Sequence, residues 1–376
     1  MTEITDSVLI NNLYRILCLP EFGLSEFRGI FEEMGILSEV ENGEIKHKQI
    51  EKINEWIDRN GGSNKDEIRL IECLEKFREL SKGEGNFNEQ LKVTENVIEY
   101  LLKLLLLPTS LHSPTSLQLL LLVLYMRIMW RYLKKTQGHA LRIAEFGRDH
   151  IIHSFRVFLL GCYILYRLYN EREDHITKCF KEDLRLICEC LSDDFKRKIF
   201  GTDEIIRQYI EEVEFSIRDI LLMWLISSLF HDIGRPIEDA VEEIKRLINT
   251  YNIEGIDIDS LVFCVAEVLK VNSNKVKEFT ELLLRDSDNN NSNFCGQIRQ
   301  FLRNRTRSEK KWDHGILSAT IIYSLLTEVY NIMEELSRRE RFSILFRYSD
   351  YYLLFYLLLY PLIAIMLHTE PSKYIF

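Results

Sequence analysis

Glycine and proline are scarce in this sequence, at 16 and 6 of 376 residues. Sheet-rich proteins need many tight turns, and these two residue types supply them. Their shortage therefore argues against a sheet-rich protein. The abundance of Leu, Ile, Glu, Lys and Arg, which favour helices, predicts an all-α fold instead.

Cysteine patterns typical of disulfide frameworks and zinc sites are also missing. The chain has eight cysteines without a CxxC pair, and the closest two, Cys188 and Cys190, are nearer in sequence than zinc-site cysteines usually are. Most of the eight stand among apolar residues. We therefore expect reduced thiols in the core of a cytoplasmic protein.

Signals that would direct the chain to a membrane are weak. The first residues, MTEITDSVLI, have neither the basic start nor the apolar run of a signal peptide. The uncharged run Tyr351–Leu367 has 17 residues, which is the lower limit for a membrane span, and Pro361 interrupts it. We expect a buried core helix there and no membrane partner.

The formal net charge is −10, which repels the phosphates of nucleic acids and makes a nucleic-acid partner the weaker expectation. The basic stretch Arg299–Lys311 is the exception. We interpret it as a solvated charged face, the alternative being a helix end beside a phosphate site. The phosphate loops GxxxxGKS/T and GxGxxG are both missing from the sequence.

Three regions can be distinguished along the chain. Residues 1–90 are predicted to be an N-terminal helical region, through which a protein partner would bind. Residues 91–140 are connecting apolar helices, and residues 141–376 contain most of the residues suited to chemistry. The segment Leu80–Glu89, with two glycines and no apolar period, is the expected linker.

The most informative segment is Leu229–Arg235, in which an apolar helix runs into a His-Asp pair followed by a glycine. A single buried His is usually a hydrogen-bonded core residue. Burying the carboxylate of Asp232 beside His231 is costly without a partner, and a divalent cation would compensate its charge and also accept the imidazole. Arg235 is then placed to meet a phosphate oxygen.

Three further histidines stand in apolar helical sequence. His153 is in phase with Val157 and Leu160, so we expect it to face the core. His314 begins one predicted helix and His368 ends another. Together with the His-Asp pair, these residues fit a metal cluster built from facing helices of a bundle.

A helical His followed by H-D-I-G-R, D-H-G-I-L-S-A and A-I-M-L-H resembles the HD-domain metal-dependent phosphohydrolases. The resemblance covers about residues 148–370 and implies that residues 141–376 are an HD-type metal-binding helical domain. The fold it implies is an HD-domain-like helical bundle with an additional N-terminal helical region. The implied activity is hydrolysis of a phosphate ester of a nucleotide or related small molecule.

The resemblance also implies roles for single residues. The implied metal ligands are the defining pair and three further histidines: His153, His231, Asp232, His314 and His368. Asp232 would bridge two ions and act in catalysis, and Arg235 would contact the substrate phosphate. We expect one or two ions of Mn, Fe, Co, Ni, Zn or Mg, which would activate the water that attacks phosphorus.

One ligand of the family pattern, an Asp that follows the last histidine, has no evident counterpart between His368 and Phe376. Asp313 or Asp350 could take its place, a longer chain could carry it, or the second metal site is incomplete. Other readings therefore stay open beside the phosphohydrolase. They are an HD nuclease or cyclic-nucleotide phosphodiesterase, a non-catalytic HD-like sensor or scaffold module, and a plain bundle with unrelated core histidines.

Overall fold

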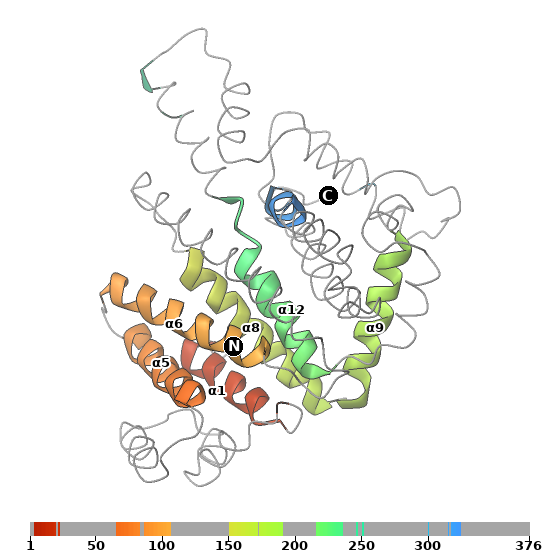
Figure 1. The fold of residues 1–376 in the computed structure, drawn as a ribbon, viewed down its shortest axis with the longest axis horizontal. Helices are drawn as coiled ribbons and strands as arrows, with labels where there is room; N and C mark the ends of the chain where they lie inside the picture. Colours follow the sequence, from red (N-terminus) through yellow and green to blue (C-terminus); the bar gives the residue numbers. More distant parts are fainter. Residues whose placement is uncertain are drawn as a thin grey trace, which may run out of the picture. The chain divides into compact units, whose positions relative to one another are not determined.

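The computed structural model describes the chain at residues 4–19, 22, 65–82, 86–106, 150–171, 173–190, 216–235, 246, 250–251, 300, 315 and 317–324. All regular elements among these residues are helices, which confirms the predicted all-α fold for this part of the chain (Figure 1). The helices are α1 (Asp6–Leu17), α5 (Lys65–Lys82), α6 (Phe87–Leu106), α8 (His150–Glu171), α9 (Glu173–Cys190) and α12 (Ile217–Phe230). Residues 317–324 are helical as well.

The chain divides into two compact units. The first comprises residues 1–113, 149–177 and 215–228, and the second comprises residues 114–148, 178–214 and 229–376. Helices α1, α5, α6 and α8 and most of α12 therefore belong to the first unit.

α5 and α6 form an antiparallel hairpin in the first unit. Lys76 Nζ lies 2.8 Å from Glu89 Oε1, and Lys103 Nζ lies 3.7 Å from Asp66 Oδ1. Helical structure extends into both ends of the predicted linker, Leu80–Glu89. The ends of the predicted linker therefore belong to α5 and α6, and the division into three regions remains a prediction.

α1 is attached to α5 by a buried polar cluster. The Tyr14 hydroxyl donates to Glu75 Oε1 at 2.8 Å, and Arg78 Nη2 donates to Asn11 Oδ1 at 2.6 Å. Burial raises the pKa of the Glu75 carboxyl, and the nearby Arg78 guanidinium partly offsets this rise. These pairings run in opposite directions along the two helices, so α1 and α5 are antiparallel.

An aromatic core joins α5 to α8. The rings of Phe77 and Phe155 meet edge to face with centroids 5.1 Å apart, and Phe155 stacks on Phe158 at 6.2 Å. All three side chains are completely buried. Because aromatic pairs add to the stability that burial of their area provides, this cluster fixes the position of α8 in the unit.

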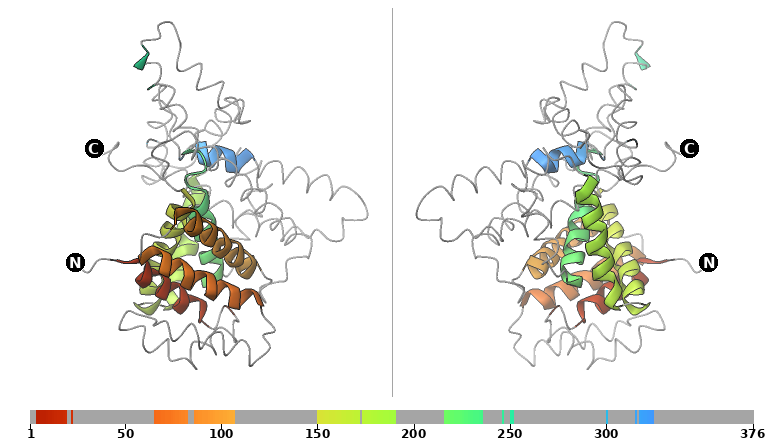
Figure 2. Two further views of the ribbon diagram at one scale, coloured as in Figure 1. Left: turned by 90° about the vertical axis from the view of Figure 1, so that its left-hand side faces the viewer. Right: turned by 90° about the vertical axis from the view of Figure 1, so that its right-hand side faces the viewer.

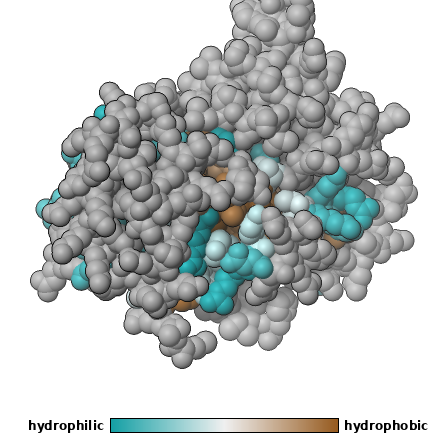
Figure 3. All heavy atoms as spheres, turned by 90° about the horizontal axis from the view of Figure 1, so that it is seen from below, coloured by the Kyte–Doolittle hydropathy of each residue, from teal (hydrophilic) through white to brown (hydrophobic). Residues whose placement is uncertain are grey.

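The opposite side of α8 is apolar but exposed. Leu160, Ile164 and Leu168 have relative exposures of 41%, 50% and 48%. Within the described residues, one helical segment, Ile151–Asn170, is long and apolar enough to cross a membrane, a criterion that a core helix also meets. On the face seen in Figure 3, a hydrophobic area of the described part lies beside hydrophilic residues.

α12 is apolar around most of its circumference, as expected of a helix that lies inside a domain. Its first turn has a capping box, in which the Ser216 N–H donates to Asp219 Oδ2 at 2.8 Å and the Asp219 N–H donates to Ser216 Oγ at 3.2 Å. The buried Arg218 Nη2 donates to the Leu104 carbonyl of α6 at 2.6 Å. These bonds satisfy helix-end groups that burial would otherwise leave unpaired.

The structure describes four cysteines, Cys18, Cys73, Cys162 and Cys179, and all four are free thiols. Cys18 and Cys162 are buried, whereas Cys179 is exposed. The expectation of core cysteines therefore holds for two of the four, and the expectation that the thiols are reduced remains a prediction.

Candidate metal centre

The His-Asp pair lies in the turn that ends α12. α12 ends at Phe230, and the Ile233 N–H donates to the Phe230 carbonyl at 3.2 Å. The Arg235 N–H donates to the Asp232 carbonyl at 2.9 Å. His231 and Asp232 are only 5% and 9% exposed, so the prediction of a His-Asp pair at the end of a buried helix is confirmed.

A contact within the second unit holds this turn. The Gly234 N–H donates to Ser318 Oγ at 2.8 Å, and both residues are buried. Ser318 belongs to the D-H-G-I-L-S-A segment, and Gly234 to H-D-I-G-R. A hydrogen bond therefore connects these two segments, which the sequence had linked only through the order of their motifs along the chain.

α8 packs antiparallel against α12 (Figures 1 and 2). The Trp224 indole Nε1 donates to the Phe158 carbonyl at 3.1 Å. A Cβ at Gly161 would overlap the same indole, so α8 approaches α12 closely only because this residue has no side chain. The beginning of α8, with His153, consequently lies at the same end as the turn that continues α12.

His153, His231 and Asp232 form a group whose ligand atoms all lie within 4.8 Å of one another. Bonds of about 2.0–2.2 Å to one ion would place two ligand atoms no more than about 4.4 Å apart. The three residues therefore need an adjustment of only a few tenths of an ångström. His231 Nε2 already lies 3.2 Å from Asp232 Oδ2.

The donor set and its burial fit a divalent ion. Two imidazole nitrogens and one carboxylate oxygen are ligands that Mn, Fe, Co, Ni and Zn accept. Asp232 is a carboxylate in a buried turn, and a cation would compensate its charge. The residues present are therefore able to hold a metal ion, although they do not identify it.

One expectation about this group is wrong. His153 was expected to face the core because it is in phase with Val157 and Leu160, but its side chain is exposed and Leu160 is 41% exposed. The buried side of α8 consists instead of Ile151, Ile152, Phe155, Phe158, Leu159 and Cys162. Because apolar residues occur on both sides of α8, the phase of His153 with Val157 and Leu160 did not identify the buried face. The aromatic contacts of Phe155 determine which face is buried. His153 is therefore the exposed member of the group.

Two of the predicted ligands, His314 and His368, lie outside the described residues, as do Asp313 and Asp350. The run Tyr351–Leu367 also lies outside them. Among the predicted metal ligands, the structure therefore brings together His153 with the His-Asp pair. Arg235 follows that pair in the same turn and is half-buried.

Two contacts of α8 were not predicted from the sequence. One is the close approach of Gly161 to Trp224, and the other is an ion pair between Arg156 and Asp6. Both join residues that are far apart in the sequence. Gly161, a glycine within an apolar helix, was the only sequence signal for either contact, and it did not identify Trp224 as the partner.

Comparison with known proteins adds no relative to this picture: no protein family matches the chain, and neither curated proteins nor solved structures gave a match.

Proposed function

We propose that this protein is a metal-dependent phosphohydrolase with an HD-type helical domain. The observation that carries the proposal is the group of His153, His231 and Asp232, whose ligand atoms lie within 4.8 Å of one another. The adjacent His231 and Asp232 of this group form the His-Asp motif on which the resemblance to HD phosphohydrolases is based. The contact between Gly234 and Ser318 adds support, because it links two segments of the same resemblance.

The protein's own residues divide the work in this proposal. His153, His231 and Asp232 would hold the ion, and a bound divalent ion supplies Lewis acidity and lowers the pKa of a coordinated water. The buried turn fixes two of these ligands, and the exposed His153 leaves a side through which a phosphate ester reaches them. Arg235 follows directly in the turn, and its guanidinium would offset the negative charge that grows on the phosphate oxygens.

The substrate class in this proposal is a phosphate ester of a nucleotide or related small molecule. The net charge of −10 is unfavourable for a nuclease, since nucleic-acid substrates present many phosphates to the whole surface. A small substrate presents its charge only to the site, so this overall repulsion acts on it less strongly.

Phosphate release tests this proposal. The chain is loaded with Mn²⁺ and incubated with phosphomonoesters and nucleotides, and the variant Asp232→Asn is compared with Asp66→Asn. Asp66 is exposed on α5 and pairs with Lys103, so it provides the same chemical change away from the group. We expect release from at least one compound, a loss of at least about 100-fold in Asp232→Asn, and no loss in Asp66→Asn. Wild-type protein that holds metal but releases phosphate from none of the compounds would contradict the proposal.

A further inference from the structure

One face of α8 carries a continuous row of apolar side chains that are open to solvent. Leu160, Ile164 and Leu168 have relative exposures of 41%, 50% and 48%, and the half-buried Val157 extends the row toward the N-terminus. Residues three or four apart on a helix are neighbours on its surface, so these four side chains form one row, which we call the α8 row. Single exposed apolar residues are common on soluble proteins, whereas a contiguous group of them marks an interaction surface.

The α8 row has the length of a site for one helix. From Val157 to Leu168 it extends about 16 Å along the helix axis, which is about three turns, and an average helix has about the same length. The half-buried Trp224 of α12 lies against Gly161 and adds its indole on the α12 side of the row. A helix that binds such a surface inserts apolar side chains with the same spacing of three and four residues.

The charge beside the α8 row is positive. The sequence has no acidic residue between positions 150 and 170. Arg167 is exposed, with its Cζ 5.2 Å from the centroid of the Tyr163 ring, and Arg15 of α1 lies 5.3 Å from the centroid of the Tyr166 ring. Because Tyr163, Tyr166 and Arg167 are neighbours on the helix surface, both guanidinium groups lie along the α1 edge of the row.

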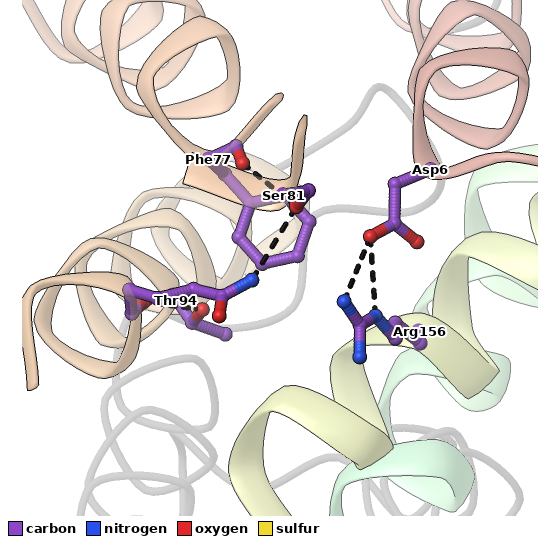
Figure 4. Close-up of polar contacts among 6 residues, drawn as sticks. Asp6, Phe77, Ser81, Thr94 and Arg156 are labelled. Carbon is purple, nitrogen blue, oxygen red and sulfur yellow. Dashed lines mark hydrogen bonds and ion pairs between the residues drawn. The ribbon is translucent and has the colours of Figure 1, made fainter. Parts of the chain in front are cut away.

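These two arginines are available to a partner. Arg156, the other arginine near the row, is held by hydrogen bonds of 2.9 Å and 3.2 Å to Asp6, and Figure 4 shows the two side chains pointing toward each other. Arg15 and Arg167, in contrast, have no ion pair within the part of the chain that the structure describes. A guanidinium over an aromatic ring keeps N–H donors with which it can bind a carboxylate.

We propose that the α8 row binds an amphipathic helix of a protein partner whose edge is acidic. Apolar side chains of that helix would pack on the row, and its carboxylates would pair with Arg15 and Arg167, which fixes the position of the helix on the row. All residues of this site belong to the first unit. The site uses none of the proposed metal ligands, so it is independent of the proposed function.

The same charges disfavour two other occupants of the row. A second copy in contact through α8 would bring no carboxylate from positions 150–170 to the two arginines. An anionic lipid surface would be repelled by the net charge of −10, because a membrane faces a large part of the protein surface. A single partner helix meets only the local positive charge.

A pair of designed peptides tests this inference on the full chain. The acidic peptide has about 18 residues, enough to form a helix, with leucines at helical spacing and glutamates along one edge. The basic peptide has lysines in place of the glutamates. Fluorescence anisotropy of the labelled peptides at low ionic strength measures binding, and we expect wild-type protein to bind the acidic peptide more tightly than the basic one.

Four variants show whether the α8 row is the binding surface. Ile164→Ser should lose about 5-fold or more of the affinity for the acidic peptide, because the half of the side chain that is exposed no longer contributes on binding. Ile4→Ser, at a site that is also 50% exposed, should have no effect. Arg167→Glu should weaken binding of the acidic peptide by about 2- to 5-fold and strengthen binding of the basic one, whereas Arg69→Glu, exposed on α5, should do neither.

Several results would overturn the inference. They are equal affinities for the acidic and basic peptides, binding of neither peptide, and an unchanged affinity in Ile164→Ser. Sedimentation that shows a dimer in wild type but not in Ile164→Ser would assign the row to a second copy instead. Binding to phosphatidylserine-containing vesicles that is lost in Ile164→Ser, without binding of either peptide, would assign it to a lipid surface.

Discussion

Gly161→Ala tests whether the close packing of α8 on α12 sets the spacing of the metal group. In the interior of an exposed helix this change would be stabilising by about 1 kcal/mol, because Ala is the better helix former. Here the new methyl group overlaps the Trp224 indole. The two effects have opposite signs, and the structure predicts which one is larger.

Overpacking of a filled core costs about 1–3 kcal/mol. Moving the indole also breaks its hydrogen bond to the Phe158 carbonyl, which contributes about 1 kcal/mol. The sum, about 2–4 kcal/mol, exceeds the gain in helix propensity and leaves a net loss of about 1–3 kcal/mol in the free energy of unfolding. Because α12 leads directly into His231 and Asp232, the shift should also weaken metal binding.

Urea denaturation of apo protein measures the free energy of unfolding, and a Mn²⁺ titration measures the second effect. Leu160→Ala is the matched control, since Leu160 is the neighbouring residue on α8 and is 41% exposed. A double-mutant cycle with Trp224→Leu adds a sharper criterion. If overlap is the cause, Gly161→Ala should cost much less in the Trp224→Leu background. Equal costs in both backgrounds, or a stabilised single variant, would refute the reasoning.

Three further changes have expected outcomes. Burial raises the pKa of the Cys162 thiol well above its ordinary value. As the pH rises above about 8.5, the unfolded chain loses this proton before the folded protein does. The free energy of unfolding should therefore fall above that pH, with a limiting slope of about 1.4 kcal/mol per pH unit. The slope measured by denaturation above pH 8.5 should be shallower in Cys162→Ala but not in the exposed-site control Cys179→Ala, and parallel slopes in wild type and Cys162→Ala would show the assignment to be wrong. Phe155→Ala should lower the free energy of unfolding by about 3–5 kcal/mol, whereas Leu168→Ala, at a site 48% exposed, should change it much less; similar losses would mean that the aromatic cluster is not the core. Tyr14→Phe leaves the buried Glu75 carboxylate without the hydroxyl that donates to it at 2.8 Å. This change should lower the free energy of unfolding by about 1–3 kcal/mol, and an unchanged value in chemical denaturation would contradict the expectation.

The all-α character could be predicted because it depends on local properties. Few turn-forming residues and long apolar runs are visible in any window of the sequence, and the apolar helix that was expected to run into the His-Asp pair is α12, which ends at Phe230. The His-Asp pair was visible for the same reason, since two adjacent polar residues at the end of an apolar helix conflict with burial unless something compensates them.

The orientation of α8 could not be predicted from its own residues. Apolar side chains surround much of this helix, so His153 could be assigned to the core by its phase with Val157 and Leu160. The partner helices determine the buried face, and the contact between Phe77 and Phe155 is not visible in the local sequence. The ion pair between Asp6 and Arg156 was missed for the same reason, because the two residues are 150 positions apart.

The proposed function depends on the claim that the group of His153, His231 and Asp232 binds a divalent ion. Elemental analysis of purified protein after incubation with Mn²⁺ and removal of free metal tests it most directly, with Asp232→Ala and His153→Ala beside the control Asp66→Ala. We expect about one or two ions per chain in wild type and in the control, and a marked loss in the other two variants, because they lack a direct ligand. Wild-type protein without bound metal, or variants that retain as much metal as wild type, would contradict the claim.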